Sequence, residues 1–516
     1  MPAAAGLLPW RPERVAARPL VALTSLLPDV VWTGGPAEGI RLTGVTLDSR
    51  SVRPGDLYAA LPGSSVHGGD FVAAARSAGA VAVLTDPAGR HRAERTGLPV
   101  AVVADPRARL GGVAAWVYGR PGESMLLIGV TGTNGKTTTA YLLEAGLRAA
   151  GHSTGMIGTV ETRIAGAAIP SVRTTPEAPD LQALLARMRE QGVDAVAMEV
   201  SSHALALGRV DGLRLDVAIF TNLSHEHLDF HPDMASYFAT KASLFTADRA
   251  ARGVVNIDDP YGERLAATAP IPVTRVSAAG DTSAQWRGVR LDAATTSGRF
   301  ELQGPGGTAV SVGLGLPGRF NVDNAALALA ALVEAGVPVE AAAAGLASVR
   351  TVAGRMERVD AGQPFLAVVD YAHTPEAVRS LLAALRSVTS GRLIVVLGCG
   401  GDRDREKRPE MGAAAVTGAD VAIFTTDNPR SEDPAQILVA MLTGAAGVPG
   451  PGRTPPVVEP DRAAAIGRAV EQAGPGDTVV VAGKGHEQGQ ELADGVVPFD
   501  DRSVLATALG RVASRA

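Results

Sequence analysis

The stretch LLIGVTGTNGKTTTAYLLEAGLRAAG, residues 126–151, decides the fold of this chain. An apolar run ends at a glycine-rich turn, and a run with helical spacing of apolar residues begins directly after it. A strand, a glycine turn and a helix N-terminus in this order place backbone amides around a phosphate group. Lys136 would reach the β- and γ-phosphates of a nucleotide, and the hydroxyl group of Thr137 would ligate Mg²⁺. The stretch therefore predicts a nucleotide-binding α/β domain.

The turn departs from the strict phosphate-loop pattern G-x-x-x-x-G-K-[ST], because Val130 stands where the first glycine belongs. An ordinary glycine turn before a helix is the simpler alternative. A phosphate loop alone would also fit a GTPase, a motor, a kinase or a ligase. The residues that we expect to surround the ATP phosphates are Gly132, Thr133, Asn134, Gly135, Lys136, Thr137 and Thr138.

Length and composition narrow the class of protein. With 516 residues, the chain is long enough for about three domains, and its 46% hydrophobic and 20% charged residues are typical of a globular protein. A net charge of -5 gives no reason to expect nucleic-acid binding. The single cysteine, Cys399, fits a reducing compartment. The N-terminal stretch MPAAAGLLPWRPERVAARPL has no uninterrupted apolar run of the kind found in signal peptides, and the longest apolar runs fall far short of the roughly 20 residues that span a bilayer. We therefore expect a cytoplasmic protein without membrane partners.

The pattern of elements predicts an α/β fold with three domains. Residues 1–121 read as a small mixed α/β domain, and residues 122–351 as a central parallel-sheet domain of the P-loop ATPase kind. In residues 352–516, apolar strands alternate with helices, which indicates a Rossmann-like, doubly wound sheet. Ligands of such sheets bind beyond the carboxyl ends of the strands, so we expect a cleft at the four strand ends marked by Asp370, Gly400, Asp427 and Gly483.

Two segments after the phosphate loop carry candidate metal ligands. Glu199 ends the apolar run in AMEVSSHAL, and its carboxylate is a hard oxygen ligand that suits Mg²⁺. The segment TNLSHEHLDFHPD holds His225, His227 and His231, which could be a polar loop or a zinc site. The absence of a nearby cysteine and the phosphate loop upstream favour magnesium over zinc. Lys241, in YFATKASLF, reads on its own as a helix-surface lysine.

Several further motifs resemble one family along nearly the whole chain. They are LTGVTLDSRSVRPGDLYAALPG, TGTNGKTT, RTTPEAPDL, MEVSSHALALGRV, GRFNVDNAALA, GRMERV, VDYAHTPEA, GCGGDRDREKRPEMG and VAGKGHE, in this order. This combination is similar to the Mur ligase family, and within it to the UDP-N-acetylmuramoyl-tripeptide synthetases. The resemblance implies an ADP-forming ligase that adds 2,6-diaminopimelate to the γ-carboxylate of UDP-N-acetylmuramoyl-L-alanyl-D-glutamate through an acyl phosphate. Such an enzyme serves peptidoglycan synthesis, and so cell wall biogenesis, cell shape and the division cycle.

The resemblance also implies residue roles. The expected catalytic residues are Lys136, Glu199, His227 and Lys241; Thr137, Glu199, His227 and Lys241 would form the metal side of the site, with Lys241 carbamylated by CO₂. Further ATP contacts would come from Asn321, Asn324, Arg355, Asp370 and His373. The UDP-muramoyl-dipeptide would be bound by Leu47, Ser49, Ser64, Ser65, Val66, Arg173, Thr174, Thr175, Ser201 and Arg209. Some relatives have a glutamine where Leu207 stands, and leucine cannot make that contact.

The stretch DNPRSEDP, residues 427–434, would choose the amino acid. The resemblance implies that Arg430 binds the distal carboxylate of diaminopimelate, since a guanidinium offers two parallel donors. The full predicted set is Arg403, Asp427, Asn428, Pro429, Arg430, Gly483 and Glu487. Lysine would leave the guanidinium unpaired, and in a closed cleft this costs about 3–5 kcal/mol. A lysine-adding ligase, a folylpolyglutamate synthetase-like ligase and a nucleotide switch remain alternatives. The residues do not distinguish LL- from meso-diaminopimelate, and we expect a monomer.

Overall fold

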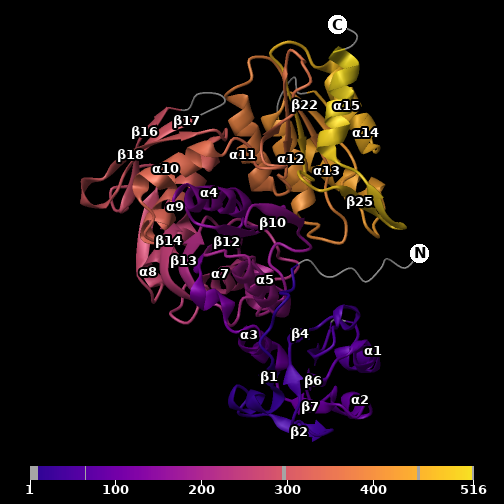
Figure 1. Cartoon of the computed structure of the whole chain (residues 1–516). Helices are drawn as coiled ribbons and strands as arrows, with labels where there is room; N and C mark the ends of the chain where they lie inside the picture. Colours follow the sequence, from indigo (N-terminus) through magenta and orange to yellow (C-terminus); the bar gives the residue numbers. More distant parts are fainter. Residues whose placement is uncertain (1–9, 64, 293–297, 450–453, 514–516) are drawn as a thin grey trace.

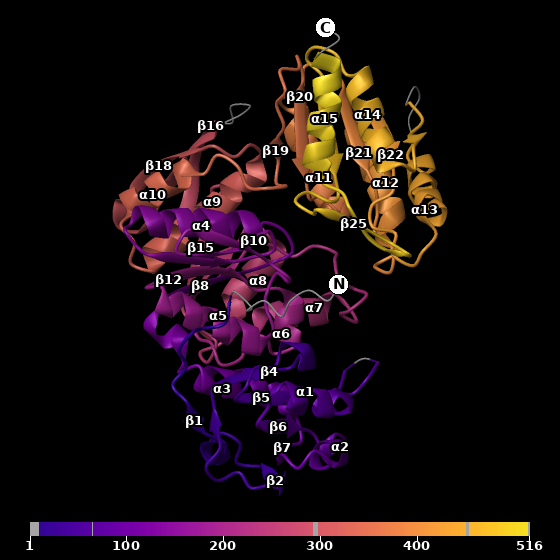
Figure 2. The same ribbon diagram turned by 45° about the vertical axis from the view of Figure 1, so that its right-hand side comes forward.

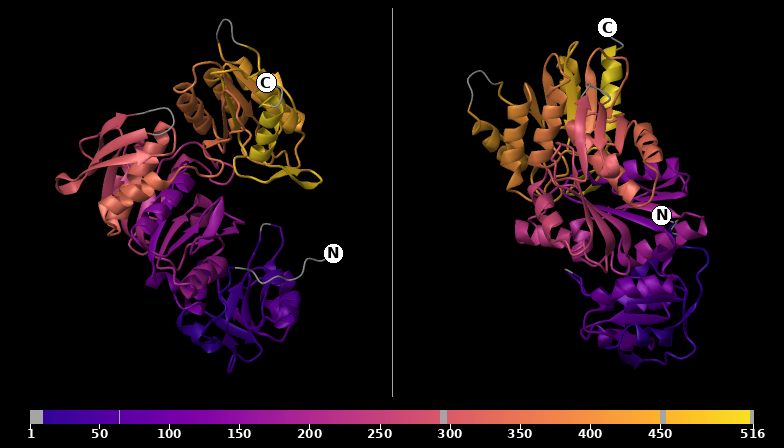
Figure 3. Two further views of the ribbon diagram at one scale, coloured as in Figure 1. Left: turned by 45° about the horizontal axis from the view of Figure 1, so that its top comes forward. Right: turned by 90° about the vertical axis from the view of Figure 1, so that its left-hand side faces the viewer.

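The computed structural model describes residues 10–63, 65–292, 298–449 and 454–513. The described chain forms three lobes in sequence order, each built on its own main sheet (Figures 1 and 3). This arrangement confirms the predicted three-domain α/β architecture. Among the described residues, no helix combines the length and the apolar character needed to cross a bilayer.

The N-terminal lobe is a five-stranded sheet in the order β2-β7-β6-β5-β4. All neighbouring strands are parallel except β2, which pairs antiparallel with β7 at the edge. Buried residues of α1 and α2 cover one face of the sheet, and α3 and η1 cover the other. The elements are β1 (Arg18–Pro19), η1 (Leu20–Ser25), β2 (Val31–Gly34), β3 (Arg41–Leu42), β4 (Gly44–Thr46), η2 (Ser49–Ser51), β5 (Asp56–Ala60), η3 (Gly68–Phe71), α1 (Val72–Ala78), β6 (Ala82–Thr85), α2 (Arg90–Glu94), β7 (Pro99–Val102), α3 (Pro106–Val117) and η4 (Pro121–Ser124).

The central lobe holds an eleven-stranded sheet, in the order β11-β10-β9-β12-β8-β13-β14-β15-β16-β17-β18. The strands β9, β12, β8, β13, β14, β15 and β16, which neighbour one another in this order, are parallel. The antiparallel strands β10 and β11 extend one end of the sheet, and the antiparallel strands β17 and β18 extend the other. The elements are β8 (Leu126–Thr131), α4 (Lys136–Ala149), β9 (Thr154–Ile157), β10 (Glu161–Ile164), β11 (Ala167–Pro170), α5 (Ala178–Glu190), β12 (Ala195–Glu199), α6 (Ser202–Ala206), β13 (Leu215–Phe220), α7 (Met234–Ala242), β14 (Ala250–Asn256), α8 (Pro260–Thr268), β15 (Val273–Ser277), β16 (Trp286–Asp292), β17 (Gly298–Gln303), η5 (Pro305–Gly307), β18 (Ala309–Leu314), α9 (Arg319–Glu334) and α10 (Val339–Ser348).

Two apolar cores enclose the central sheet and fix the strand that carries the phosphate loop. Helices α4, α9 and α10 pack on one face, and α5, α7 and α8 pack on the other. Strand β8 lies between β12 and β13, and its Ile128 and Val130 are fully buried. The loop after Thr131 therefore leaves the middle of a rigid sheet.

The C-terminal lobe is a six-stranded sheet in the order β19-β20-β24-β21-β22-β23, parallel except for β19. Helices α11, α12 and α13 cover one face and α14 and α15 the other, as a doubly wound sheet requires (Figure 2). The elements are β19 (Glu357–Arg358), β20 (Leu366–Asp370), α11 (Pro375–Arg386), β21 (Leu393–Leu397), α12 (Lys407–Gly418), β22 (Val421–Phe424), α13 (Pro434–Ala446), β23 (Val457–Val458), α14 (Arg462–Gln472), β24 (Thr478–Ala482), β25 (Gly489–Leu492), β26 (Gly495–Pro498) and α15 (Asp501–Ala513).

Candidate active site

The phosphate loop spans the turn between β8 and α4, and it is held from the neighbouring strand. Asn222 accepts the backbone N–H groups of both Thr133 (2.9 Å) and Asn134 (3.0 Å). The hydroxyl group of Thr221 donates to the carbonyl oxygen of Asn134 at 2.6 Å. These bonds join the loop to the segment at the end of β13.

Two glycines of this loop are required by close approach. Gly132 has φ +143°, and a Cβ there would lie 1.9 Å from Oγ1 of Thr221. Gly135 has φ +90°, and a Cβ there would lie 2.2 Å from Oδ1 of Asn324 on α9. Both positions combine a backbone conformation that favours glycine with a neighbour that excludes a side chain.

Lys136 is the first residue of α4, and its side chain folds back over the loop. Its Nζ donates to the carbonyl oxygens of Gly132 (3.0 Å) and Thr133 (2.8 Å). Burial lowers the pKa of this lysine, while the carboxylates of Glu226 and Glu199 oppose the shift. The ammonium group is therefore placed at the mouth of the loop, where a phosphate oxygen could replace the carbonyl groups.

Glu199 lies at the carboxyl end of β12 and is 1% exposed. Its two carboxylate oxygens accept bonds from the backbone N–H (2.8 Å) and the hydroxyl group (3.0 Å) of Thr159. The hydroxyl group of Thr174 lies 3.0 Å from that of Thr159. Thr175 donates to the carbonyl oxygen of Glu199 at 2.9 Å, and the backbone N–H of Ser201 donates to Thr175 at 3.1 Å. Three of the residues predicted for the muramoyl-dipeptide thus lie around the predicted metal ligand.

His227 is held in an unusual backbone conformation beside the loop. Its φ is +58°, and its carbonyl oxygen accepts the N–H groups of Phe230 (3.1 Å) and His231 (2.8 Å). Burial lowers the pKa of its imidazole to about 3, so the ring is neutral at neutral pH and keeps a lone pair for a ligand. No group of three or more His, Cys, Asp or Glu side chains placed to hold a metal ion occurs in the described part of the chain.

Glu226, which sequence reasoning passed over, connects this segment to the C-terminal lobe. Its Oε1 lies 2.8 Å from Nε2 of His373. Burial opposes ionisation of the carboxyl group, but His227, His373 and Lys136 together hold the pKa of Glu226 well below its usual range. Its place between His225 and His227 in the SHEH segment was the signal that could have revealed it.

Lys241 is buried, not on the helix surface that its sequence alone suggested. It is 1% exposed, and its Nζ donates to the carbonyl oxygen of Gly132 at 2.8 Å. This Nζ also lies 4.7 Å from the ring centre of Tyr237. Burial, with a further contribution from Lys136, holds the pKa of Lys241 well below its usual range.

The C-terminal lobe contributes a guanidinium group to the phosphate loop. Nη2 of Arg355 donates to the hydroxyl group of Thr137 at 3.1 Å, and its guanidinium lies 4.4 Å from the ring centre of Tyr371. Asp370 is buried and accepts the backbone N–H groups of Met356 (2.7 Å) and Ala372 (2.8 Å). Asp370 therefore shapes the segment that carries Arg355.

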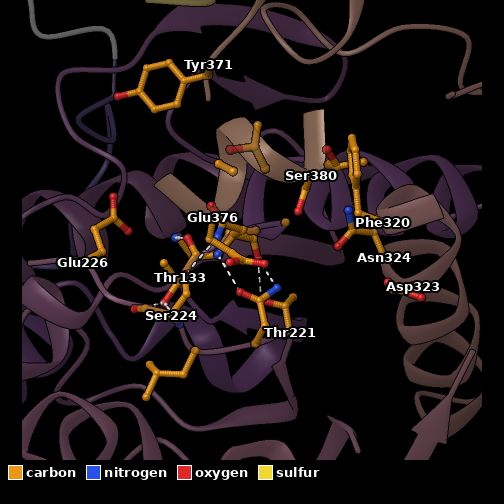
Figure 4. A pocket seen from close by; sticks show the side chains of 18 of the residues that line it. Thr133, Thr221, Ser224, Glu226, Phe320, Asp323, Asn324, Tyr371, Glu376 and Ser380 are labelled. Carbon is orange, nitrogen blue, oxygen red and sulfur yellow. Dashed lines mark hydrogen bonds between the residues drawn. The ribbon is translucent and has the colours of Figure 1, made fainter. Parts of the chain in front are cut away.

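A cavity of about 630 Å³ collects most of these residues between the central and C-terminal lobes (Figure 4). In Figure 4, Thr133, Ser224 and Glu226 lie on one side of this space, and Phe320, Asn324 and Ser380 lie on the other. The predicted residues that line it are Thr133, Asn134, Gly135, Lys136, Thr137, Thr138, Thr174, Glu199, Ser201, His227, Asn324, Arg355, Asp370 and His373. Gly132, Lys241 and Asn321 lie outside this lining, and Asn321 instead donates to the carbonyl oxygen of Pro317 at 2.6 Å.

The residues predicted for the uridine diphosphate lie at one edge of the N-terminal sheet. Leu47 and Ser49 follow β4, and Ser65 and Val66 follow β5. Because β4 and β5 are neighbouring parallel strands, both loops leave the same edge. Ser64 lies outside the described residues.

The two predicted arginines of the muramoyl-dipeptide group share one acid. Glu177 accepts a hydrogen bond from Nη1 of Arg173 at 2.8 Å and pairs with Nε of Arg209 at 2.9 Å. Arg209 also donates to the carbonyl oxygen of Thr175 at 3.4 Å. Sequence reasoning missed Glu177, although it lies in the RTTPEAPDL motif.

A second cavity, of about 720 Å³, separates the β10–β11 hairpin of the central lobe from the C-terminal lobe. Asn428 and Glu487 line it and are joined, with Nδ2 of Asn428 donating to Oε2 of Glu487 at 2.8 Å. Lys484, fully buried, donates to Oδ1 of Asn428 at 2.8 Å and pairs with Glu487 at 3.0 Å. Sequence reasoning passed over Lys484 within VAGKGHE. Gly483 has φ +112°, and a Cβ there would lie 2.6 Å from Oδ2 of Asp427.

Arg430 stands beside this cavity with its partners in place. Its φ is +53°, and its backbone N–H donates to the carbonyl oxygen of Glu491 at 3.0 Å. Its guanidinium donates to the carbonyl oxygen of Gly401 at 2.7 Å and pairs with the Glu491 carboxylate at 2.5 Å. Pro429 is buried, whereas Arg403 is exposed and donates to the carbonyl oxygen of Asp402 at 3.1 Å. Of the seven residues predicted for diaminopimelate, Asn428 and Glu487 line this cavity, and Arg403, Asp427, Pro429, Arg430 and Gly483 do not.

A phosphate loop in a parallel sheet, contacted by an arginine from a separate doubly wound domain, defines a nucleotide-binding class of α/β protein, and a second cavity lies beside the C-terminal lobe. Three family models match consecutive parts of the chain: the Mur ligase family catalytic domain at residues 41–118, the Mur ligase middle domain at 130–332 and the Mur ligase glutamate ligase domain at 354–485. The chain belongs to the Mur ligase family.

Among its relatives are proteins named UDP-N-acetylmuramoyl-L-alanyl-D-glutamate--2,6-diaminopimelate ligase. That of Streptomyces coelicolor is 57% identical over 97% of this chain and 98% of its own length. That of Corynebacterium glutamicum is 50% identical over 92% of this chain and 94% of its own. A solved structure with the same protein name has a TM-score of 0.65 and 31% identity, and the match covers 98% of this chain and 100% of that one.

Proposed function

We propose that this protein is an ATP-dependent ligase that joins 2,6-diaminopimelate to the γ-carboxylate of UDP-N-acetylmuramoyl-L-alanyl-D-glutamate, in peptidoglycan synthesis. The relatives carry this activity in their names over almost the full chain. The observation that carries the proposal is the cavity shared by two domains. The phosphate loop and Glu199 line it from one domain, and Arg355 and His373 line it from the other.

The chemistry proceeds in two steps. The γ-carboxylate of the substrate attacks the γ-phosphorus of ATP, which gives an acyl phosphate and releases ADP. An amine of diaminopimelate then attacks the acyl carbon, an amide bond forms, and phosphate leaves with the proton lost to solvent. Lys136 and Arg355 stabilise negative charge on the transferring phosphoryl group, and no side chain acts as nucleophile.

Mg²⁺ is the metal that fits the donors near the phosphate loop. The Thr137 hydroxyl group and the Glu199 carboxylate are hard oxygen ligands, and both line the cavity together with the neutral imidazole of His227. These residues would hold the ion, which supplies neutralisation of phosphate charge. Glu199 is kept in place for this role by its two bonds from Thr159.

Lys241 is proposed to carry a carbamate in the active enzyme. Its amine attacks the carbon of CO₂, an N–C bond forms as one C=O π pair moves onto oxygen, and the nitrogen loses a proton to solvent. Only a neutral amine can do this, and the low pKa of buried Lys241 favours that form. The product would place an anionic carbamate beside Gly132 in place of the neutral amine, and its oxygens would complete the oxygen-rich side of the metal site.

The second cavity is proposed to receive diaminopimelate. Glu487 would pair with an ammonium group, and Asn428 and the Gly483 backbone would complete the amino-acid end. Arg430, with Arg403 reaching in from its exposed position, would bind the distal carboxylate. Asp427 and Pro429 support this loop.

The UDP-muramoyl-dipeptide is proposed to lie along the N-terminal and central lobes. The uridine diphosphate would contact Leu47, Ser49 and the Ser64–Val66 loop. Arg173 and Arg209 would hold the peptide arm, with Thr174, Thr175 and Ser201 close to Glu199.

We place the domain boundaries at 121/122 and 351/352 and propose a cytoplasmic monomer. Neither nucleic acid nor a membrane is part of the proposed cycle, because all of the substrates are small molecules.

A panel of amino acids tests the function. ADP formation is measured with ATP, Mg²⁺ and the UDP-muramoyl-dipeptide, adding LL- or meso-diaminopimelate, lysine or glutamate. The proposal predicts turnover that requires both the nucleotide-dipeptide and diaminopimelate. ATP hydrolysis of equal rate without either substrate would instead indicate a nucleotide switch, and a preference for lysine would contradict the assigned amino acid.

A further inference from the structure

The strongest unassigned feature lies on the β25–β26 hairpin beside the second cavity. Glu491, on β25, reaches back to the DNPR loop and pairs with Nε of Arg430 at 2.5 Å. The same residue makes two backbone contacts to this loop. Its carbonyl oxygen accepts the N–H of Arg430 at 3.0 Å, and its N–H donates to Oδ1 of Asn428 at 3.0 Å. The carboxylate is therefore presented to Arg430 by a fixed backbone.

The chemistry of this pair resembles that of a bound substrate. Arg430 is the cation proposed to take the distal carboxylate of diaminopimelate, and a carboxylate from the chain already occupies it. Glu491 also lines the second cavity. Its side chain is 47% exposed, whereas that of Arg430 is 23% exposed. Glu491 can thus turn into solvent at little cost, while the arginine stays beside the cavity.

We infer that Glu491 tunes the choice of amino acid: its carboxylate occupies Arg430 until the distal carboxylate of the amino acid displaces it, which lowers the preference for diaminopimelate over lysine. This inference rests on the proposed function. Diaminopimelate has a carboxylate to exchange for that of Glu491. Lysine has none, and the Arg430–Glu491 pair persists when lysine binds.

The exchange has a defined effect on selectivity. Breaking a partly exposed ion pair opposes diaminopimelate binding modestly, because such pairs are weak in water. Removing the Glu491 carboxylate should therefore strengthen diaminopimelate binding by about two- to fivefold. Lysine binding should not change, so the preference for diaminopimelate over lysine rises by the same factor.

The test uses the full-length protein with Glu491→Gln and Glu491→Ala. The alanine variant excludes the possibility that a new amide contact causes the effect. Dissociation constants for diaminopimelate and lysine are measured by calorimetry with a non-hydrolysable ATP analogue and the nucleotide-dipeptide present, and kcat/KM is measured for both amino acids. Asp494→Asn is the matched control, because it removes the same charge from the turn of the same exposed hairpin.

The inference predicts tighter diaminopimelate binding in both Glu491 variants and unchanged binding in Asp494→Asn. Weaker diaminopimelate binding in the Glu491 variants would overturn it, since Glu491 would then orient Arg430 and not compete for it. Binding equal to wild type in all three variants, or an equal gain in Asp494→Asn, would also overturn it. If the proposed function itself is wrong, the wild-type protein will neither bind nor use diaminopimelate, and this outcome is distinct from those of the variants.

Discussion

Nε2 of His373 lies 2.8 Å from Oε1 of Glu226, although 147 positions separate the two residues in the chain. Glu226 belongs to the segment that follows β13, and His373 follows β20 in the C-terminal lobe. The same segment makes a second contact with the C-terminal lobe, since Nε2 of His225 lies 3.4 Å from Oδ2 of Asp404. One short segment of the central lobe thus contacts the C-terminal lobe twice, and the Glu226–His373 contact lines the cavity between the two lobes.

Breaking the Glu226–His373 pair should weaken the use of ATP. We expect Glu226→Ala and His373→Ala each to lower kcat/KM for ATP by about tenfold or more, as for loss of a hydrogen bond to a charged group. In the double variant, kcat/KM for ATP should be little lower than in the weaker of the two single variants, because each substitution removes the same interaction. Steady-state kinetics of the three variants give the coupling energy. Fully additive effects would show that the two residues act independently.

Lys241→Ala should be nearly inactive, because it removes the site of the proposed carbamate. Formate or acetate should partly restore activity by filling the vacated anion site. Carbon-13 NMR of protein supplied with labelled bicarbonate gives a readout independent of turnover. The carbamate signal should be present in the wild type and in a Lys407→Ala control, and absent in Lys241→Ala. A fully active wild-type preparation without that signal would contradict the modification.

Arg430→Ala should reduce kcat/KM for diaminopimelate by about 10- to 100-fold, as for loss of a charged hydrogen bond worth about 1.5–3 kcal/mol. This is less than the sequence-based figure for a closed cleft. That figure assumed an unpaired, buried guanidinium, whereas Glu491 already pairs with Arg430 at the cavity edge. The rate with lysine should fall much less. Equal losses with both amino acids would show that Arg430 supports only the loop.

The stability of the protein should fall with acid in a window set partly by His486. Burial lowers the pKa of His486 to about 4, and its Nδ1 has no hydrogen-bond partner among the described residues. In the unfolded chain, His486 has the ordinary histidine pKa of about 6.5 and binds a proton below that pH. In the folded state it binds the proton only near pH 4. The free energy of unfolding should therefore decrease as pH falls from about 6.5 to about 4, by at most about 1.4 kcal/mol per pH unit for this group.

Replacing His486 by Asn should make this decrease shallower. Chemical denaturation between pH 4 and 8 measures the slope. His91→Asn serves as the control, because that side chain is 88% exposed and the change makes the same substitution at the surface. A slope that is identical in His486→Asn and wild type would contradict the assignment.

Much of the fold follows from short-range signals in the sequence. The apolar run before Gly132 and the helical spacing after Gly135 predict β8, the phosphate loop and α4, because each depends on neighbours in the chain. The alternating strands and helices after residue 352 likewise predict the doubly wound sheet. The antiparallel edge strand β2 was not predicted, since its pairing with β7 joins residues distant in sequence.

The candidate site was predictable where a motif carries it, and less so where partners come from elsewhere. Lys136 and Glu199 follow from the strand ends that present them. The burial of Lys241 does not follow from its helix, because the carbonyl group that it contacts belongs to Gly132, 109 positions away. The Arg430–Glu491 pair depends on the β25–β26 hairpin, which folds back over the DNPR loop. The pattern of charges in the sequence does not show which residue of that hairpin lies opposite Arg430.

The C-terminal lobe carries His373 at one cavity and Asn428 and Glu487 at the other, on loops of one continuous sheet. Strands β20, β24, β21 and β22 are joined edge to edge, so the two sets of loops cannot move far relative to each other. A rigid-body rotation of this lobe would therefore change the enclosure of ATP and the position of the incoming amine at the same time. Such a motion would couple formation of the acyl phosphate to the arrival of the amine of diaminopimelate, and would so limit hydrolysis of the acyl phosphate by water.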